Sequence, residues 1–220
     1  RDLRMSRGLG DVYKRQLLTR RCLELIDRYE FGVAVQTKSA RILRDFDLLT
    51  SINEKAKAIV QITLTTYDED LCKKIEPDVS TTKERINVLM KCKEAGIPTV
   101  VWLTPILPFI NDTADNIKNL LDACVDAGVK GIIFFGIGVT LRDGDREYFY
   151  HALDKDFPGM KEKYIRTYGN AYNLPSPNEK MLIPMIVEQC QKAGILCSPD
   201  ECFAYLHHFP EKYVQRSLFE

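Results

Sequence analysis

The chain has 220 residues, of which 45% are hydrophobic and 28% are charged, a composition typical of a folded domain with one sizeable core. Its 31 basic and 31 acidic residues cancel, so no overall positive field favours nucleic acid, and only a local basic patch could serve that purpose. The longest apolar runs are too short to span a membrane, and no secretory signal is apparent. We therefore expect a cytoplasmic protein with no membrane partner.

Seven cysteines are spread widely along the chain, and their odd number argues against a disulfide framework. This usage favours a reducing compartment. No CxxC or CxxxCxxC spacing occurs, and Cys190, Cys197 and Cys202 lie at intervals that fit no usual zinc or iron–sulfur pattern. We expect these cysteines to be buried apolar residues and predict no metal ligand within this chain.

The first sixteen residues, RDLRMSRGLGDVYKRQ, differ from everything after them. They carry five basic and two acidic residues and show no apolar periodicity. A basic arm or a targeting peptide is one interpretation. We favour a non-native, disordered leader at 1–16, because SRGLGDVYKRQ resembles the translated adapter read-through found at broken ends of metagenomic proteins. We then expect a natural N-terminal part to be missing, with 17–220 forming one domain.

From Leu17 onward the apolar pattern alternates between helical and strand periods, with strands about 30 residues apart, as in βα units. In chain order the sequence predicts a helix at 17–28, a strand at 31–37, a helix at 40–57, a strand at 58–65, a helix at 81–95, a strand at 99–104, a helix at 114–127 and a strand at 130–135. Ser80 is the expected N-cap of the third of these helices, with Glu84 near the capping-box position.

Beyond Phe135 the alternation of strands and helices ends. The sequence there predicts a turn followed by helices, among them 160–168, 178–193 and 199–209. Four βα units cannot close an eight-stranded barrel, and the first strand would leave an unpaired edge. The residues alone therefore predict an α/β fold with parallel strands, forming part of a barrel enzyme.

Polar residues follow the predicted strands, and parallel strands bring such positions to one rim. These strand-end positions are Lys38 with Ser39, Thr63 with Thr65, Thr104 with Pro105, and Gly136 with Gly138. A lysine, hydroxyls and glycines at a rim suit a small anionic or carboxylate-bearing ligand. Each residue also has a plainer interpretation: Lys38 as a solvated side chain, Thr63 as a β-branched strand former, Glu76 as part of a turn and Arg85 as a surface helix residue.

Several blocks occur together in a specific order: TRRCLELIDRYEFGV, QTKSARILRDFDLL, VQITLTTYDEDLCKKIEP, STTKERI, AGIP, TPILPFINDT, TLRDGDREYFY and RTYGN. This combination resembles the spore photoproduct lyase-like branch of the radical SAM superfamily, often labelled DNA repair photolyase-like. The resemblance covers the chain from Leu17 to the closing SLFE.

The resemblance implies the C-terminal part of a partial (βα)6 TIM-like barrel, followed by C-terminal helices. In that family a CxxxCxxC loop binds a [4Fe–4S] cluster, whose open iron chelates S-adenosylmethionine (AdoMet). Reductive cleavage of AdoMet then gives a 5′-deoxyadenosyl radical. By position, the resemblance implies that Lys38, with Ser39, would offer charge to the AdoMet carboxylate, Thr63 a hydroxyl, and Thr104 a contact with adenosine. Glu76 and Arg85 fall in a matching block, either as ligand contacts or as a structural ion pair.

The chain departs from the family because the cluster motif and the first strands are absent from it. The resemblance therefore implies a fragment of a radical SAM enzyme, lyase-like, whose cluster ligands and catalytic residues lie outside this chain. Its implied partners are an electron donor such as flavodoxin or ferredoxin and a possible nucleic-acid substrate. Two alternatives stay open: a non-radical barrel enzyme of the aldolase or phosphate-binding type, and a catalytically inert truncated chain.

Overall fold

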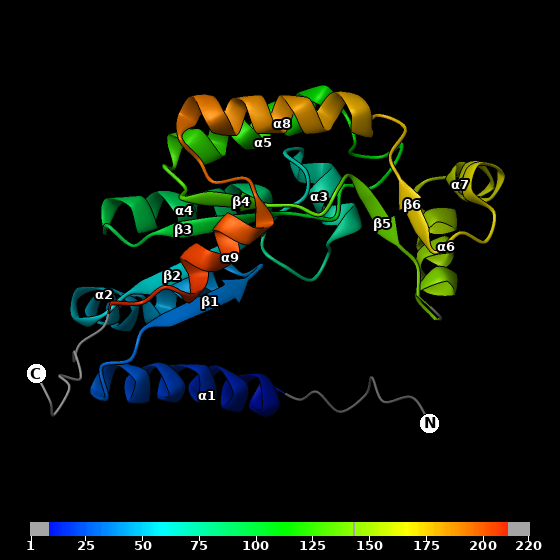
Figure 1. Cartoon of the computed structure of the whole chain (residues 1–220). Helices are drawn as coiled ribbons and strands as arrows, with labels where there is room; N and C mark the ends of the chain where they lie inside the picture. Colours follow the sequence, from blue (N-terminus) through cyan, green and yellow to red (C-terminus); the bar gives the residue numbers. More distant parts are fainter. Residues whose placement is uncertain (1–8, 143, 211–220) are drawn as a thin grey trace, which may run out of the picture.

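The computed structural model describes residues 9–142 and 144–210, and it is built around a four-stranded sheet (Figure 1). All four strands are parallel and run in the spatial order β1-β2-β3-β4. They are β1 (Val33–Thr37), β2 (Ala58–Leu64), β3 (Thr99–Leu103) and β4 (Gly131–Ile133). The predicted α/β class, the four strands and the parallel pairing are confirmed.

Helices cover one face of this sheet, which we call the outer face. In chain order they are α1 (Leu9–Arg28), the 3-10 helix η1 (Ala40–Asp45), α2 (Phe46–Lys55), α4 (Thr82–Glu94), α5 (Ala114–Asp126) and α8 (Glu179–Ala193). Alternate residues of β2, from Ala58 to Leu64, enter the main hydrophobic core on this face and are fully buried. The helix predicted at 40–57 is in fact two elements, η1 followed by α2.

The N-terminus of α4 shows how local sequence sets an element's start. Thr81 is the N-cap: its side chain accepts a bond from the Glu84 N–H, and the Glu84 carboxylate accepts one from the Thr81 N–H. This reciprocal capping box satisfies two N–H groups that would otherwise lack helical partners. The capping box was predicted, but its N-cap lies one residue later than the expected Ser80.

The opposite face, which we call the inner face, is only partly covered. Helix α9 (Pro199–His207) lies across its amino-terminal half (Figure 1) and packs against Ile59, Val100 and Ile133. Gly131 permits this approach, since a Cβ there would come within 2.8 Å of the Cys202 sulfur. Just before α9, Leu196 pairs with Gly131 in a parallel bridge and extends the sheet beyond β4 by one residue.

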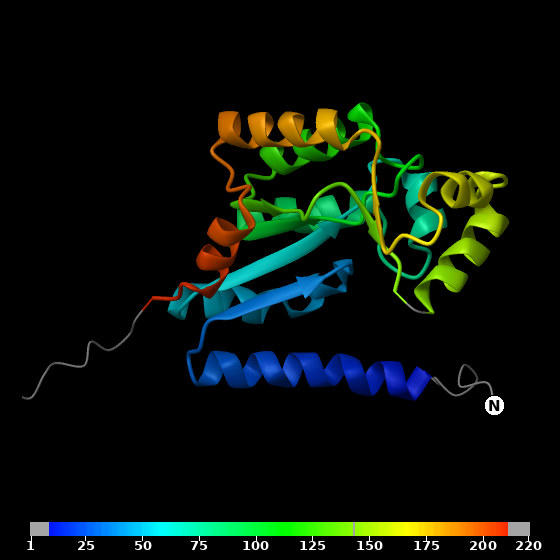
Figure 2. The ribbon, with the colours of Figure 1, turned by 45° about the vertical axis from the view of Figure 1, so that its right-hand side comes forward.

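A small cap lies at the carboxyl ends of the strands, to the right in Figures 1 and 2. It comprises the antiparallel pair β5 (Gly138–Thr140) and β6 (Asn173–Pro175) with α6 (Asp145–Asp156) and α7 (Met160–Tyr168). Tyr164 is fully buried in its separate core and donates a hydrogen bond of 2.6 Å to the Pro108 carbonyl. The sequence predicted α7 but not the β5-β6 pair.

Helix α1 begins at Leu9, inside the segment that we expected to be a disordered leader. Residues 9–16 are therefore helical, while 1–8 lie outside the described residues. Whether 1–16 is foreign to the protein stays a prediction. Among the helices that the structure describes, none combines the length and the apolar character needed to cross a membrane.

Candidate functional site

The predicted strand-end residues lie along the carboxyl rim of the sheet. Lys38 follows β1, Thr63 is the second-last residue of β2, and Thr104 follows β3. Register pairing places Thr37 beside Ile62 and Thr63 beside Trp102. Because neighbouring strands are about 4.8 Å apart, these positions follow one another along the rim.

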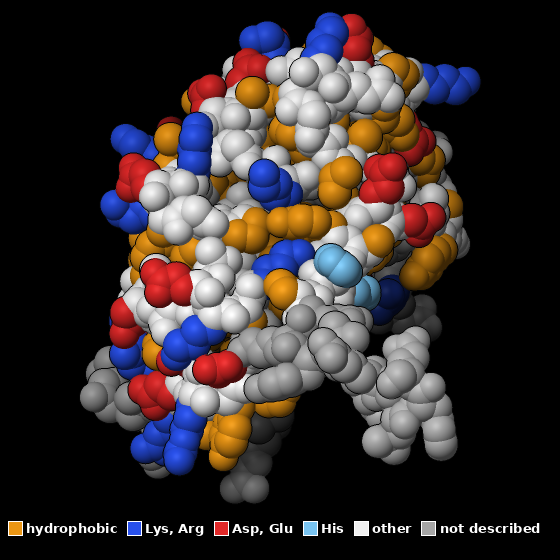
Figure 3. Space-filling model, turned by 60° about the vertical axis from the view of Figure 1, so that its left-hand side comes forward, with side chains coloured by type: hydrophobic (Ala, Val, Ile, Leu, Met, Phe, Trp, Pro, Cys, Tyr) orange, Lys and Arg blue, Asp and Glu red, His pale blue; other side chains and the backbone are white. Residues whose placement is uncertain are grey.

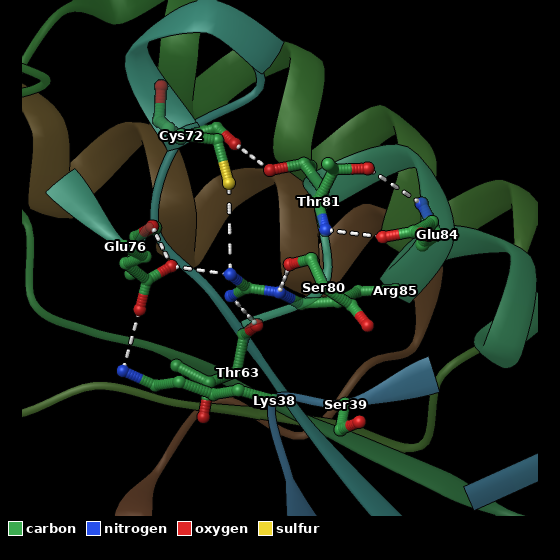
Figure 4. A network of polar contacts seen from close by, with 12 residues as sticks. Lys38, Ser39, Thr63, Cys72, Glu76, Ser80, Thr81, Glu84 and Arg85 are labelled. Atoms are coloured by element: carbon green, nitrogen blue, oxygen red, sulfur yellow. Dashed lines mark hydrogen bonds and ion pairs between the residues drawn. The ribbon is translucent and has the colours of Figure 1, made fainter. Parts of the chain in front are cut away.

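Glu76 links two of the predicted residues into a charged cluster (Figure 4). Its carboxylate accepts bonds of 2.7 Å from Lys38 Nζ and of 2.7 Å from Arg85 Nη2. The Thr65 hydroxyl donates a third bond of 2.9 Å to the same carboxylate. Glu76 is placed there by helix α3 (Glu69–Ile75), an element that the sequence did not predict.

Arg85 lies beneath the rim with a fully buried side chain. Besides Glu76, its guanidinium donates to the carbonyls of Thr63 (2.9 Å) and Ser80 (2.7 Å). These contacts tie α4 to the end of β2 and leave Arg85 no exposed surface for direct ligand contact. The geometry favours the structural ion pair among the two roles expected for Arg85.

The cluster is electrostatically asymmetric. Burial alone would raise the pKa of Glu76, but the Lys38 ammonium and the Arg85 guanidinium outweigh it and hold that pKa below its usual range. Two cations around one carboxylate leave a formal excess of one positive charge. Only Lys38 can present this charge to solvent, because its side chain is 39% exposed and the other two are almost wholly buried.

Lys38 and Ser39 share one groove, so the structure brings these two predicted residues together. The groove has a volume of about 700 Å³ and is also lined by Arg41, Asp78 and Glu84. The Ser39 side chain accepts a bond of 3.2 Å from the Arg41 N–H and caps η1. The groove thus combines a partly free ammonium with a hydroxyl held in place by local structure.

The inner face next to the rim carries amide and aromatic side chains. Gln61 accepts a hydrogen bond of 2.8 Å from Trp102 Nε1, and Gln36 lies beside Gln61 in the strand register. Thr63 is two residues after Gln61, so it faces the same side of β2, and it is buried. Phe135 is 67% exposed, with its ring 6.2 Å from that of Trp102. This face can contact a ligand with both polar and planar parts.

Thr104 lines a second pocket, of about 310 Å³, with Phe135 and the loop Gly136–Gly138. The Thr104–Pro105 peptide bond is cis. Glu179, at the start of α8, lines the same pocket and accepts a bond of 3.2 Å from the Ile137 N–H. Gly136 has a positive φ of 86°, and a Cβ there would come within 2.8 Å of the Glu179 carboxylate.

Several residues of the rim were not predicted from the sequence. Glu179 comes from an expected terminal helix, and nothing local marked it as part of the rim. Asn111 and Asn116 were also missed, although both donate to the buried Thr65 carbonyl, over 2.7 Å and 3.2 Å. The segment FINDTADN, which is rich in polar residues, contains both asparagines and could have indicated them.

The cysteines do not fit an iron–sulfur cluster. All seven lie among the described residues as free thiols, and five of them are buried. Burial raises the pKa of the Cys190 thiol to about 12 and that of Cys202 to about 11, which disfavours the thiolate that binds iron. Within the described ranges, no group of three or more His, Cys, Asp or Glu side chains could hold a metal ion.

Charge on the molecular surface is mixed where Figure 3 shows it. Lys and Arg side chains alternate with Asp and Glu side chains on that face and do not gather into one basic patch. No described feature therefore singles out a phosphate backbone as the ligand of that face.

Comparison with solved structures shows which known proteins have a similar fold. Spore photoproduct lyase complexed with dinucleoside spore photoproduct superposes with a TM-score of 0.56 at 14% identity, covering 81% of this chain and 54% of that one. A domain of pyruvate-formate lyase-activating enzyme from Bacteroides vulgatus gives a TM-score of 0.51 at 12% identity, covering 83% and 92%. The chain shares the fold of these two proteins, in the form seen in spore photoproduct lyase. The predicted resemblance and partial barrel are confirmed at the level of the fold.

Sequence relatives of this chain include three curated proteins. An uncharacterised protein of Mycobacterium tuberculosis is 25% identical over 150 residues, covering 68% of this chain and 44% of the relative. A protein of Acidianus two-tailed virus is 28% identical over 181 residues, covering 77% and 59%. The sporulation killing factor maturation protein SkfB of Bacillus subtilis is 34% identical over 85 residues, covering 38% and 19%. The chain thus spans about half the length of the first two relatives. No protein-family model matches it.

Proposed function

We propose that this chain forms the AdoMet-binding wall of a radical SAM enzyme of the spore photoproduct lyase-like type. The observation that carries the proposal is the surplus positive charge of the Lys38–Glu76–Arg85 cluster, presented by Lys38 alone at the carboxyl rim of a radical SAM fold. A spore photoproduct lyase of the same fold is known with bound AdoMet, and superposes with a TM-score of 0.55.

The rim residues suit the parts of AdoMet. Lys38 Nζ has three donors and gives one to Glu76, which leaves donors for a carboxylate. Ser39 adds a hydroxyl in the same groove. The Thr63 hydroxyl, which the resemblance also implies, belongs to the neighbouring strand and is buried, so it does not line this groove. Thr104 and the exposed Phe135 ring offer a hydroxyl and a planar apolar contact to the adenosine end. Glu76 and Arg85 act by holding Lys38 in position.

When bound and reductively cleaved, AdoMet would supply a 5′-deoxyadenosyl radical. Since the seven cysteines do not fit a [4Fe–4S] cluster, we assign none of them to that cofactor and derive no step through it. An electron donor of the flavodoxin or ferredoxin type and a nucleic-acid substrate remain parts of the proposal that rest on the family resemblance, as does a cytoplasmic location.

The sole tryptophan of the chain, Trp102, tests the proposal because it lies on the inner face beside the rim. Titration with AdoMet should change its fluorescence in a saturable way. Lys38→Ala should raise the dissociation constant by about 10- to 100-fold, the value of a charge-assisted hydrogen bond. Lys83→Ala, which removes an exposed lysine from α4, is the matched control and should have no effect.

No saturable change with AdoMet, in fluorescence and in equilibrium dialysis alike, would contradict the proposal. Inorganic phosphate serves as the comparison ligand. Binding of phosphate in place of AdoMet would favour the barrel enzyme of phosphate-binding type.

A further inference from the structure

A pocket of about 450 Å³ lies between α3 and the cap, apart from the charged cluster at the rim. Figure 2 shows α6 close to α3 at the carboxyl end of the sheet, and residues of both helices line the pocket. The walls are mostly hydrocarbon and aromatic, contributed by Ile75, Leu107, Ile110, Phe149 and Phe157. Tyr148 stands at the pocket and is 79% exposed, more than any other large hydrophobic side chain among the described residues. A cavity of this size and lining suits a small ring system.

The pocket adjoins the proposed AdoMet site. Pro105 and Val139 line both this pocket and the one beside Thr104. Pro105 follows β3, and Val139 lies in β5, so these two residues form the partition between the two spaces. A molecule seated between α3 and α6 would therefore lie next to the proposed AdoMet site.

Two lysines flank the pocket without ion pairs. Lys74 on α3 and Lys155 on α6 line it, and no described carboxylate lies within salt-bridge distance of either. Lysines nearby on the same two sides are paired: Lys73 with Asp70 at 3.3 Å, and Lys161 with Asp154 at 2.7 Å.

One carboxylate, that of Asp156, also lines the pocket, and His151 lies there too. The two lysines and this aspartate leave a formal charge of +1 with His151 neutral. The combination of aromatic walls and surplus positive charge is complementary to a ring that carries a negative charge.

We propose that this pocket binds an aromatic ring bearing an anionic substituent, and that this group belongs to the substrate. The ring packs against Phe149, Phe157 and Tyr148, and the anionic group faces Lys74 and Lys155. That the occupant is a substrate rests on the proposed function. That the pocket takes an aromatic anion rests on its own walls and charges.

The probe is 8-anilinonaphthalene-1-sulfonate, an aromatic anion that becomes fluorescent in apolar surroundings. It should bind the native chain saturably, and the uncharged N-phenyl-1-naphthylamine should bind severalfold more weakly. Ala152→Phe fills the pocket from the wall of α6 and should weaken binding at least about tenfold. The double change Lys74→Glu with Lys155→Glu should weaken binding severalfold. Circular dichroism establishes that each variant is folded.

Two controls locate the probe. Lys83→Glu alters charge away from the pocket, and Phe135→Ala removes the exposed ring of the inner face; both should leave binding unchanged. Equal binding by wild type and the folded Ala152→Phe variant, or equal affinity for the charged and uncharged dyes, would overturn the proposal. Ala152→Phe should not alter AdoMet binding by Trp102 fluorescence, so failure of this pocket and failure of the AdoMet proposal are separate results.

Discussion

The two faces of strand β2 differ sharply. On the outer face Ala58, Val60, Ile62 and Leu64 are fully buried under helices, and their role is packing. On the inner face and at the rim, the side chains of Gln61 and Thr65 form hydrogen bonds with Trp102 and Glu76. The Thr63 carbonyl accepts a hydrogen bond from Arg85. The same strand thus supplies stability on one side and a candidate binding surface on the other. A substitution should therefore act on folding or on binding according to its face.

The largest effect on stability should come from Arg85, which is buried and also holds Glu76 at the candidate binding rim. Arg85→Ala removes one of the two cationic partners of the Glu76 carboxylate, which is 90% buried, and leaves two carbonyls without that donor. We expect a loss of about 3–5 kcal/mol in the free energy of unfolding, measured by urea denaturation. A loss below about 1 kcal/mol would contradict the structural role of Arg85.

A pair of substitutions on adjacent strands tests the faces themselves. Ile62→Ala, in the outer core, should cost about 2–5 kcal/mol because it leaves a cavity among packed side chains. Gln36→Ala, on the exposed inner side of β1, should change stability by no more than about 0.5 kcal/mol. Equal losses in urea denaturation would show that the inner face is as tightly packed as the outer one.

A smaller effect should appear in the pH dependence of stability. The pKa of Glu76 is lowered in the folded protein, so the unfolded chain binds more protons at this site as the pH falls. Stability from Glu76 is thus present above its ordinary pKa and is lost as the pH falls through the lowered value. The gap in unfolding free energy between wild type and Glu76→Gln should be widest at neutral pH and should narrow below about pH 4.5.

A gap between wild type and Glu76→Gln that widens in acid would reverse the assigned direction of the shift. Lys192→Ala provides the comparison. It removes the exposed partner of Glu188, whose pKa is also lowered, but its effect on stability at any pH should be slight because that pair is open to solvent.

Local pattern predicted the βα framework well, because buried strands and capped helices have strong sequence periods. The strands at 58–65 and 99–104 were predicted within one residue of β2 and β3 at each end. The capping box at Glu84 marked the start of α4 to within a residue. Lys38, Ser39 and Thr104 were found at the rim because parallel strands all end on one side.

The remainder depended on contacts between distant segments. Helix α3 is short and follows a polar loop, so its period was too brief to detect, and Glu76 was taken for part of a turn. The β5-β6 pair joins residues about 35 positions apart, and each strand has three residues. Leu196 extends the sheet through a single bridge that leaves no strand pattern in the sequence. These features become apparent only when the chain is folded.

Equilibrium dialysis with radiolabelled AdoMet tests the central claim most directly, because it measures binding without relying on Trp102. The wild-type chain and Lys83→Ala should bind one equivalent with the same dissociation constant, and Lys38→Ala should bind about 10- to 100-fold more weakly while remaining folded. Equal affinity of wild type and Lys38→Ala for AdoMet, or no binding by either, would contradict the assignment of this rim as an AdoMet site.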